Sequence, residues 1–276
     1  AINTRQEIPF TSSLIFLYSL FNLIIILLDN KHMRIPRIYT SAELVLNTLI
    51  ELDSEASNHV GKVLRMKSGY QITLFNGDGA DYAATISEVT KRTVTVSIDD
   101  SIETNTESCL YTHIGQVISR GDRMDYMIQK STELGVSEIT PLTSERCEVK
   151  LKGDREEKRV KHWQQIAISA AEQCGRSKVP AINSIMSLDE WVKDKPEEEL
   201  GLVMHHRTTQ SLTDLKKPQK ARLLIGPEGG LSESEIESAI TQGFTATTLG
   251  PRVFRSETAP IATLSIIQWL WGDFNQ

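Results

Sequence analysis

Apolar and polar residues follow two alternating patterns along the carboxyl-terminal part of the chain, from His113 onward. Short apolar runs of strand length recur at residues 113–119, 138–142, 181–185, 200–205, 223–226 and 244–249. Between them, apolar residues recur with a helical period at residues 122–135, 156–173, 188–193, 232–243 and 258–271. Strands that alternate with helices are typical of a parallel sheet covered on both faces. The pattern therefore predicts an α/β domain in this part of the chain.

The pattern before residue 104 is different and predicts mostly β structure with one helix. Strands are expected at residues 71–75, 81–89 and 93–98, with a hairpin turn at Asn76-Gly77-Asp78-Gly79. The helix is expected at Ser57–Met66, with Val60, Val63 and Leu64 on one face. Residues 101–108 are polar and lack aromatic side chains, so we place a domain boundary there.

Residues 1–32 differ from the rest of the chain. Residues 13–28 are strongly apolar but form a run of only about 16 residues, whereas a membrane span needs about 20. A signal peptide is disfavoured, because the segment has no basic run before the apolar stretch and no small-residue cleavage site. We expect an upstream leader that is absent from the native product. A peripheral membrane anchor and a packed helix are the alternatives, and no stable membrane association is expected.

Composition and charge narrow the function classes. The 276 residues carry a formal net charge of −6, so any binding to a polyanion must come from local basic patches. The one sustained basic run is Arg146–Lys161, with a solvated helix face as the alternative to RNA contact. Three distant cysteines, Cys109, Cys147 and Cys174, indicate reduced thiols in a cytosolic protein, and no zinc spacing is present.

The stretch from Leu223 to Pro260 carries the strongest candidate for a binding site. A short strand runs into the turn Gly226-Pro227-Glu228-Gly229-Gly230, and a helix follows whose start is marked by Ser232 and Glu235. Such a glycine turn before a helix is typical of phosphate sites, but Glu228, Glu233 and Glu235 would repel a polyphosphate. We therefore expect a neutral or cationic ligand, and the alternative is a purely structural turn.

The same stretch also resembles a known family. The sequence GPEGG, followed by LGPRVFRSETAP, resembles the cofactor loops of the SPOUT methyltransferases, and most closely those of the RsmE family. Four further segments share this resemblance: MRIPRIY at residues 33–39, HVGKVLRMKSGY at 59–70, QKSTELGVSEITPLTSERC at 129–147, and AAEQCGR at 170–176. The resemblance implies a PUA-like RNA-binding β-barrel at residues 33–104. It further implies a SPOUT domain at 105–276, whose parallel sheet carries a trefoil knot.

The resemblance also implies the activity, which is S-adenosylmethionine-dependent methylation of N3 of a uridine in 16S ribosomal RNA. The alternatives are an inactive RNA-binding assembly factor, and a SPOUT enzyme that acts on transfer RNA or on ribose. The cofactor is expected to lie between three loops, which are the loop after His205, the GPEGG turn and the loop from Leu249 to Glu257. The residues expected to bind it are Met204, His205, Ile225, Gly226, Pro227, Gly229, Gly230, Leu249, Gly250, Val253 and Phe254.

Catalysis is assigned to two side chains on the last loop. Arg255 is expected to stabilise the anion that develops on the base, and Glu257 is expected to accept the N3 proton. The alternative is that these two side chains only pair with each other and fix the loop. No metal is expected, because neither the reaction nor any ligand spacing requires one.

RNA contacts are expected from basic residues of both domains and from one acidic residue. The set is Arg34, Arg37, Lys62, Arg65, Lys67, Arg146, Lys150, Lys152, Glu172 and Arg176. Scattered solubilising charge is the alternative for the small domain, and a Glu172–Arg176 pair across one helical turn is the simplest alternative for those two residues. The expected partners are 16S ribosomal RNA in the assembled small subunit and a second copy of the chain, in the cytoplasm.

Overall fold

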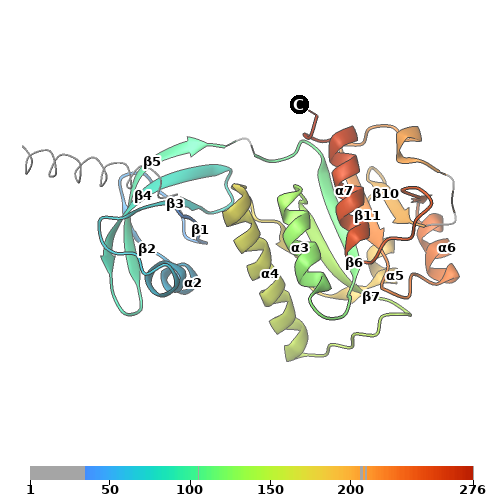
Figure 1. Cartoon of the computed structure of the whole chain (residues 1–276), viewed down its shortest axis with the longest axis horizontal. Helices are drawn as coiled ribbons and strands as arrows, with labels where there is room; N and C mark the ends of the chain where they lie inside the picture. Colours follow the sequence, from blue (N-terminus) through green and yellow to red (C-terminus); the bar gives the residue numbers. More distant parts are fainter. Residues whose placement is uncertain (1–34, 105, 206–207, 209, 276) are drawn as a thin grey trace, which may run out of the picture. The chain divides into compact units, whose positions relative to one another are not determined.

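The computed structural model describes residues 35–104, 106–205, 208 and 210–275 (Figure 1). The predicted leader and Arg34 therefore lie outside the described residues. From Arg37 onward the chain forms one compact unit. It contains a small β domain followed by a larger α/β domain, as the patterns predict.

The small domain is a five-stranded sheet with the order β1-β3-β4-β5-β2. Its strands are β1 (Arg37–Tyr39), β2 (Leu49–Glu51), β3 (Gln71–Phe75), β4 (Ala80–Val89) and β5 (Val94–Glu103). β1 runs parallel to β3, and the other pairs are antiparallel. Alternate strand residues such as Ile72, Leu74 and Val96 fill its core. β5 extends through Glu103, so the first three residues of the predicted linker belong to the sheet.

The helix of the small domain differs from the prediction. It begins at Ser54, where the Asp53 side chain accepts hydrogen bonds from two backbone N–H groups, and α2 (Ser54–Asn58) passes into a π-helical turn, η1 (His59–Val63). Val60 is fully buried, but Val63 is 65% exposed and Leu64 is also exposed. The prediction that Val60, Val63 and Leu64 share one buried face was wrong. A π turn adds a residue and rotates the side chains that follow it away from the core.

The α/β domain is built on a parallel sheet with the order β12-β10-β11-β6-β7-β8, in which β9 also pairs with β7. Its strands are β6 (Tyr111–Val117), β7 (Glu138–Thr143), β8 (Ala181–Ile182), β9 (Met186–Ser187), β10 (Leu200–Met204), β11 (Lys220–Ile225) and β12 (Phe244–Thr247). Its helices are α3 (Arg123–Glu133), α4 (Asp154–Cys174), α5 (Leu188–Lys193), η2 (Leu212–Asp214), α6 (Glu233–Thr241) and α7 (Thr258–Leu270).

Helices cover both faces of this sheet, as Figure 1 shows. On β11, Leu223 and Ile225 point into the core formed with α3, α4 and α7, while Leu224 points into the core formed with α5 and α6. This double burial explains why the strand reads as a continuous apolar run. The strand order agrees with the SPOUT resemblance, and the knotted crossing itself stays a prediction.

Local rules account for most helix ends. At α6, Ser232 accepts from the Glu235 backbone N–H while the Glu235 carboxylate accepts from the Ser232 N–H, and Gly243 follows with a φ of +79°. Two details differ from the sequence-based expectation. Asp122 precedes α3 without a capping hydrogen bond from its side chain. Ile240 is exposed, because α6 meets the domain through a narrow contact centred on Ala239.

Candidate cofactor site

The carboxyl ends of β10, β11 and β12 meet at one edge of the sheet and frame a cavity of about 630 Å³. Open α/β sheets bind ligands at this edge, because the loops that leave the strands diverge there. The cavity is lined by Met204 and His205 after β10, by the turn after β11, and by the segment from Thr247 to Ala259 that joins β12 to α7. Its volume lies in the usual range for small-molecule and cofactor sites.

The GPEGG turn lines the cavity, and its glycines allow a close chain reversal there. A Cβ on Gly226 would lie 3.0 Å from Cγ of Leu231 and 3.1 Å from its backbone nitrogen, and Gly230 has a φ of +68°. Arg146 donates from Nη1 to the carbonyl oxygens of Gly229 (3.1 Å) and Leu231 (3.3 Å). Backbone amides of the turn are therefore held in place beside the cavity.

One arginine connects the two loops that carry carboxylates. Arg123, the first residue of α3, forms an ion pair with Glu228 of the GPEGG turn, and its Nε lies 3.7 Å from Oε2 of Glu257. Burial raises the pKa of Glu228, but hydrogen bonds from the Arg120 backbone and from Arg123 outweigh burial, and the net pKa lies below its usual value. Glu228 is therefore ionised at neutral pH.

A second contact fixes the position of Glu257. The Ser119 hydroxyl, just after β6, donates to the Ser256 hydroxyl at 3.0 Å, and the Ser256 hydroxyl donates to Oε2 of Glu257 at 3.3 Å. Ser119 and Ser256 are both buried. The Glu257 carboxylate is therefore held beside the cavity through Oε2, which lies near both the Arg123 guanidinium and the Ser256 hydroxyl.

The chemistry of the cavity fits S-adenosylmethionine. Ile225, Leu249 and Phe254 give it an apolar wall that suits an adenine ring, and backbone groups of the glycine turn are free of side chains that would block a base edge. Glu228 and Glu257 line the cavity together with Arg123, Arg252 and Arg255, so the charge of the lining does not by itself select a cation over a phosphate. Of the three acidic residues expected near this turn, only Glu228 lines the cavity. Glu235 caps α6 and accepts from the Glu145 backbone N–H.

The structure brings together nearly all of the residues predicted for the cofactor. The predicted residues that line the cavity are Met204, His205, Ile225, Gly226, Pro227, Gly229, Gly230, Leu249, Val253 and Phe254. Gly250 is not among the lining residues; its φ of +92° assigns it a role in the bend of the loop. Sequence reasoning missed Arg123. A signal was present, because Arg123 opens the helix after β6, whose carboxyl end lies at the same sheet edge.

The two predicted catalytic residues also line the cavity. Glu257 forms an ion pair with Arg123. The alternative, in which Arg255 and Glu257 pair only with each other, therefore does not account for this contact. Arg255 is exposed beside the opening. Their roles in catalysis stay predictions.

The predicted RNA-contacting residues fall into two groups. Lys62, Arg65, Lys67, Lys150 and Lys152 are exposed. Arg146 is exposed as well, but its guanidinium holds the GPEGG turn as described above.

Arg37, Glu172 and Arg176 form the second group, whose side chains are turned inward. Arg176 is 5% exposed and pairs with Glu107, while Glu172 accepts from the Tyr39 N–H at 3.0 Å. The expected Glu172–Arg176 pair was wrong, because tertiary partners for both side chains replace it. Arg37 pairs with Asp81. Because Arg37 and Arg176 both pair with carboxylates of the protein, their placement speaks against a phosphate contact by either arginine.

The described part of the chain lacks two further features. Among those residues, no group of three or more His, Cys, Asp or Glu side chains is arranged to hold a metal ion. Within the same residues, no helix has both the length and the apolar character needed to cross a membrane.

Comparisons with known proteins place this geometry in a family. Residues 106–268, more than half of the chain, match the model of an RNA methyltransferase domain, and residues 52–99 match an RNA methyltransferase PUA domain. The ribosomal RNA small subunit methyltransferase E of Buchnera aphidicola is 40% identical over 243 residues, which cover 88% of this chain and 99% of that protein. The Bacillus subtilis protein of the same name is 30% identical, with 79% and 89% covered.

A solved structure supports the same assignment. The crystal structure of a ribosomal RNA small subunit methyltransferase E from Neisseria gonorrhoeae bound to S-adenosyl methionine matches with a TM-score of 0.82 and 39% identity. The match covers 87% of this chain and all of that one. The chain therefore belongs to the RsmE family of SPOUT RNA methyltransferases, with a PUA-like domain ahead of the α/β domain.

Proposed function

We propose that this protein transfers the methyl group of S-adenosylmethionine to N3 of a uridine in 16S ribosomal RNA. Family membership supports transfer to small-subunit ribosomal RNA, and the N. gonorrhoeae relative binds the same methyl donor. The observation that carries the proposal within this chain is the single cavity in which the GPEGG turn and the Leu249–Glu257 loop meet. The glycine turn holds the donor, and the last loop faces the acceptor.

The donor supplies an electrophilic methyl group on a sulfonium. The chain must therefore hold a uridine with N3 in line with that group and remove the N3 proton. Glu257 is the proposed acceptor of this proton, and the contacts of its carboxylate with Ser256 and Arg123 beside the cavity support this role. As the proton passes to Glu257, the N3 electron pair forms the new N–C bond and the carbon–sulfur bond breaks toward sulfur.

Arg255 complements this step by charge. A uracil that loses its N3 proton carries negative charge on its ring oxygens, and an exposed guanidinium at the opening stabilises that charge. Arg123 is already paired with Glu228 and Glu257, so Arg255 is the better candidate for contact with the base. The exposed basic residues Lys62, Arg65, Lys67, Lys150 and Lys152 are proposed to contact RNA phosphates.

The proposal extends to the assembly state and the substrate particle. Helix α7 leaves Ile266 (37%) and Trp269 (59%) exposed on its outer side, which suits a second copy of the chain. We propose a homodimer that works in the cytoplasm on the assembled small subunit. Sedimentation that finds a fully active monomer would exclude the dimer.

The central test is a nucleoside analysis. Purified protein and S-adenosylmethionine are incubated with small subunits, or with free 16S RNA, from a strain that lacks this modification. We expect 3-methyluridine to appear in the small subunits, with less in the free RNA. Calorimetric binding of the donor without any methylation would instead favour the assembly-factor alternative. Methylation of transfer RNA or of a ribose hydroxyl would overturn the choice of acceptor.

A further inference from the structure

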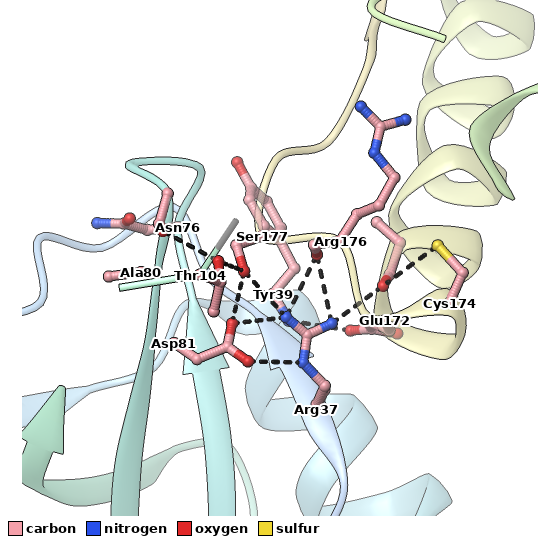
Figure 2. A network of polar contacts seen from close by, with 12 residues as sticks. Arg37, Tyr39, Asn76, Ala80, Asp81, Thr104, Glu172, Cys174, Arg176 and Ser177 are labelled. Carbon is pink, nitrogen blue, oxygen red and sulfur yellow. Dashed lines mark hydrogen bonds and ion pairs between the residues drawn. The ribbon is translucent and has the colours of Figure 1, made fainter. Parts of the chain in front are cut away.

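The carboxyl-terminal end of α4 meets the small domain through a set of directional polar contacts, drawn in Figure 2. α4 ends at Cys174, and Gly175 follows with a φ of +88°. The carbonyl groups at the end of a helix carry the negative end of its dipole. This end of α4 is therefore suited to a cation from outside the helix.

Arg37 of β1 supplies that cation. Its Nη1 donates to the carbonyl oxygens of Ala171 (3.1 Å) and Arg176 (3.3 Å). On the other edge of the guanidinium, Nε and Nη2 donate to the two carboxylate oxygens of Asp81 on β4, at 3.1 and 2.6 Å. Only an arginine presents donors on both edges of one plane, so a lysine cannot make the same set.

A buried hydroxyl extends the contact. Ser177 is fully buried, donates to Oδ1 of Asp81 at 2.7 Å, and accepts from the Thr104 hydroxyl at 2.6 Å. Thr104 follows β5 directly. Asp81 is thus the acceptor shared by a cation of the small domain and a hydroxyl of the α/β domain.

A second contact is made by the side chain of Glu172, the residue after Ala171 on α4. Glu172 accepts from the Tyr39 backbone N–H at 3.0 Å, and its Oε2 lies 3.8 Å from Nδ1 of His59. Burial is the largest influence on the pKa of Glu172 and raises it. Two residues of β1 therefore contact α4 at separate points, which restricts rotation of the strand about either point.

The receiving turn is fixed on its other side by Arg176. Its guanidinium donates to the carbonyl oxygens of Thr132 (3.0 Å) and Val136 (2.8 Å) at the end of α3, and it pairs with Glu107. The Arg176 carbonyl, meanwhile, accepts from Arg37. The turn after α4 is therefore rigidly attached to the α/β domain and presents fixed acceptors to the small domain.

We propose that Arg37 is a positioning residue that sets the orientation of the small domain on α4, and through it the position of bound RNA relative to the methyl-transfer cavity. This inference rests on the proposed function. It differs from the sequence-based expectation, in which Arg37 contacts RNA phosphate directly. Directional hydrogen bonds fix an angle between two bodies, which an apolar contact does less well.

The test compares Arg37→Lys and Asp81→Asn with the wild type, using small subunits that lack the modification as substrate. We expect both variants to raise KM for the subunits about tenfold while kcat changes little, because only molecules whose small domain has the wild-type orientation bind the subunits productively, and the variants lower that fraction. Binding of S-adenosylmethionine, measured by calorimetry, should be unchanged. Arg92→Ala, which removes an exposed arginine of the same domain outside the network, is the matched control and should leave KM unchanged.

Asp81→Asn separates the two roles of Arg37. The variant removes a negative charge, which by itself favours a polyanion, so a direct phosphate contact predicts an unchanged or lower KM. A higher KM supports positioning, and an unchanged or lower one overturns it. If either variant melts far below the wild type, Ser177→Ala replaces it with the same expectation. A wild type that binds no donor or makes no 3-methyluridine would instead refute the proposed function, so the two failures are distinguishable.

Discussion

The two edges of the parallel sheet carry polar side chains in opposite arrangements. At the carboxyl edge, Glu228 and Glu257 lie on loops, Arg123 is the first residue of α3, and all three line a cavity. At the amino edge, Arg222 pairs with Glu199 at 2.9 Å with side-chain exposures of 6% and 7%, and His113 is buried against Trp191 of α5. Polar groups that contact only each other stabilise a fold, whereas polar groups that face an open space are available to a ligand.

The amino edge shows how fully such a cluster can be satisfied. The Trp191 indole N–H donates to Nε2 of His113 at 3.3 Å, and the Thr140 hydroxyl lies 2.7 Å from the same nitrogen. Arg222 donates to the Trp191 carbonyl at 3.1 Å and lies over the Trp191 ring. With this much internal pairing, we expect changes at the amino edge to alter stability and changes at the carboxyl edge to alter activity.

The largest effect is expected from Glu257→Gln at the carboxyl edge. Loss of the proton acceptor should lower kcat by about 100-fold or more, since general bases contribute roughly 10²–10⁴-fold. Donor affinity and melting temperature should stay near wild type. The measurement is single-turnover formation of 3-methyluridine, with Glu237→Gln, an exposed glutamate of α6, as the control. Wild-type kcat in Glu257→Gln would remove Glu257 from the mechanism.

At the amino edge, Arg222→Met should lower the stability of the fold and leave methyl transfer unchanged. The variant leaves Glu199 buried without its cation, which costs on the order of 3 kcal/mol in the free energy of unfolding. Urea denaturation followed by circular dichroism measures this loss. Methyl transfer per folded molecule should be unchanged at low temperature. A stable variant with impaired transfer would break the distinction between the two edges.

Gly226→Ala tests the GPEGG turn, which lines the cavity. The added Cβ would lie 3.0 Å from Cγ of Leu231 and 3.1 Å from its backbone nitrogen, so the GPEGG turn must shift. We expect affinity for S-adenosylmethionine to fall about tenfold, because one or two hydrogen bonds of about 1 kcal/mol each are misaligned. Gly61→Ala is the control, since its Cβ would meet only side chains at 3.6 and 3.7 Å. Unchanged affinity in Gly226→Ala would place the donor away from this turn.

The smallest effect concerns pH and the amino edge. Burial, opposed by Glu138 and assisted by Arg222, lowers the pKa of His113 to about 4 from its ordinary 6.5. Above the unfolded pKa of about 6.5 the ring is neutral in both states, and stability is unaffected. As pH falls from about 6.5 toward 4, the unfolded chain binds a proton that the folded chain does not bind, so stability is lost. The loss should reach about 1 kcal/mol near pH 5.5.

His113→Gln is the control for this pH effect, because it removes the titrating ring. The slope of stability between pH 6.5 and 5 should flatten in the variant, measured by urea denaturation at each pH. An equally steep slope in His113→Gln would assign the effect to other groups, such as Glu138, whose pKa is lowered by its hydrogen bonds against the effect of burial.

Most helices and strands of the α/β domain, its parallel sheet and the loops that line the cavity could be predicted from the sequence, whereas the helix of the small domain could not. These features follow from local rules: apolar periodicity, the Ser232–Glu235 capping box, and glycines where the chain must turn tightly. The family resemblance fixed the expected donor and reaction.

Which charged side chains meet depends on contacts between distant parts of the folded chain. Arg123 faces Glu228 and Glu257 across more than a hundred residues of sequence, and Arg37 reaches the end of α4 from β1. The local Glu172–Arg176 pair failed for the same reason, since each side chain found a better partner elsewhere. An exposed ion pair within one helical turn is worth only a few tenths of a kcal/mol, so any buried, hydrogen-bonded alternative outweighs it.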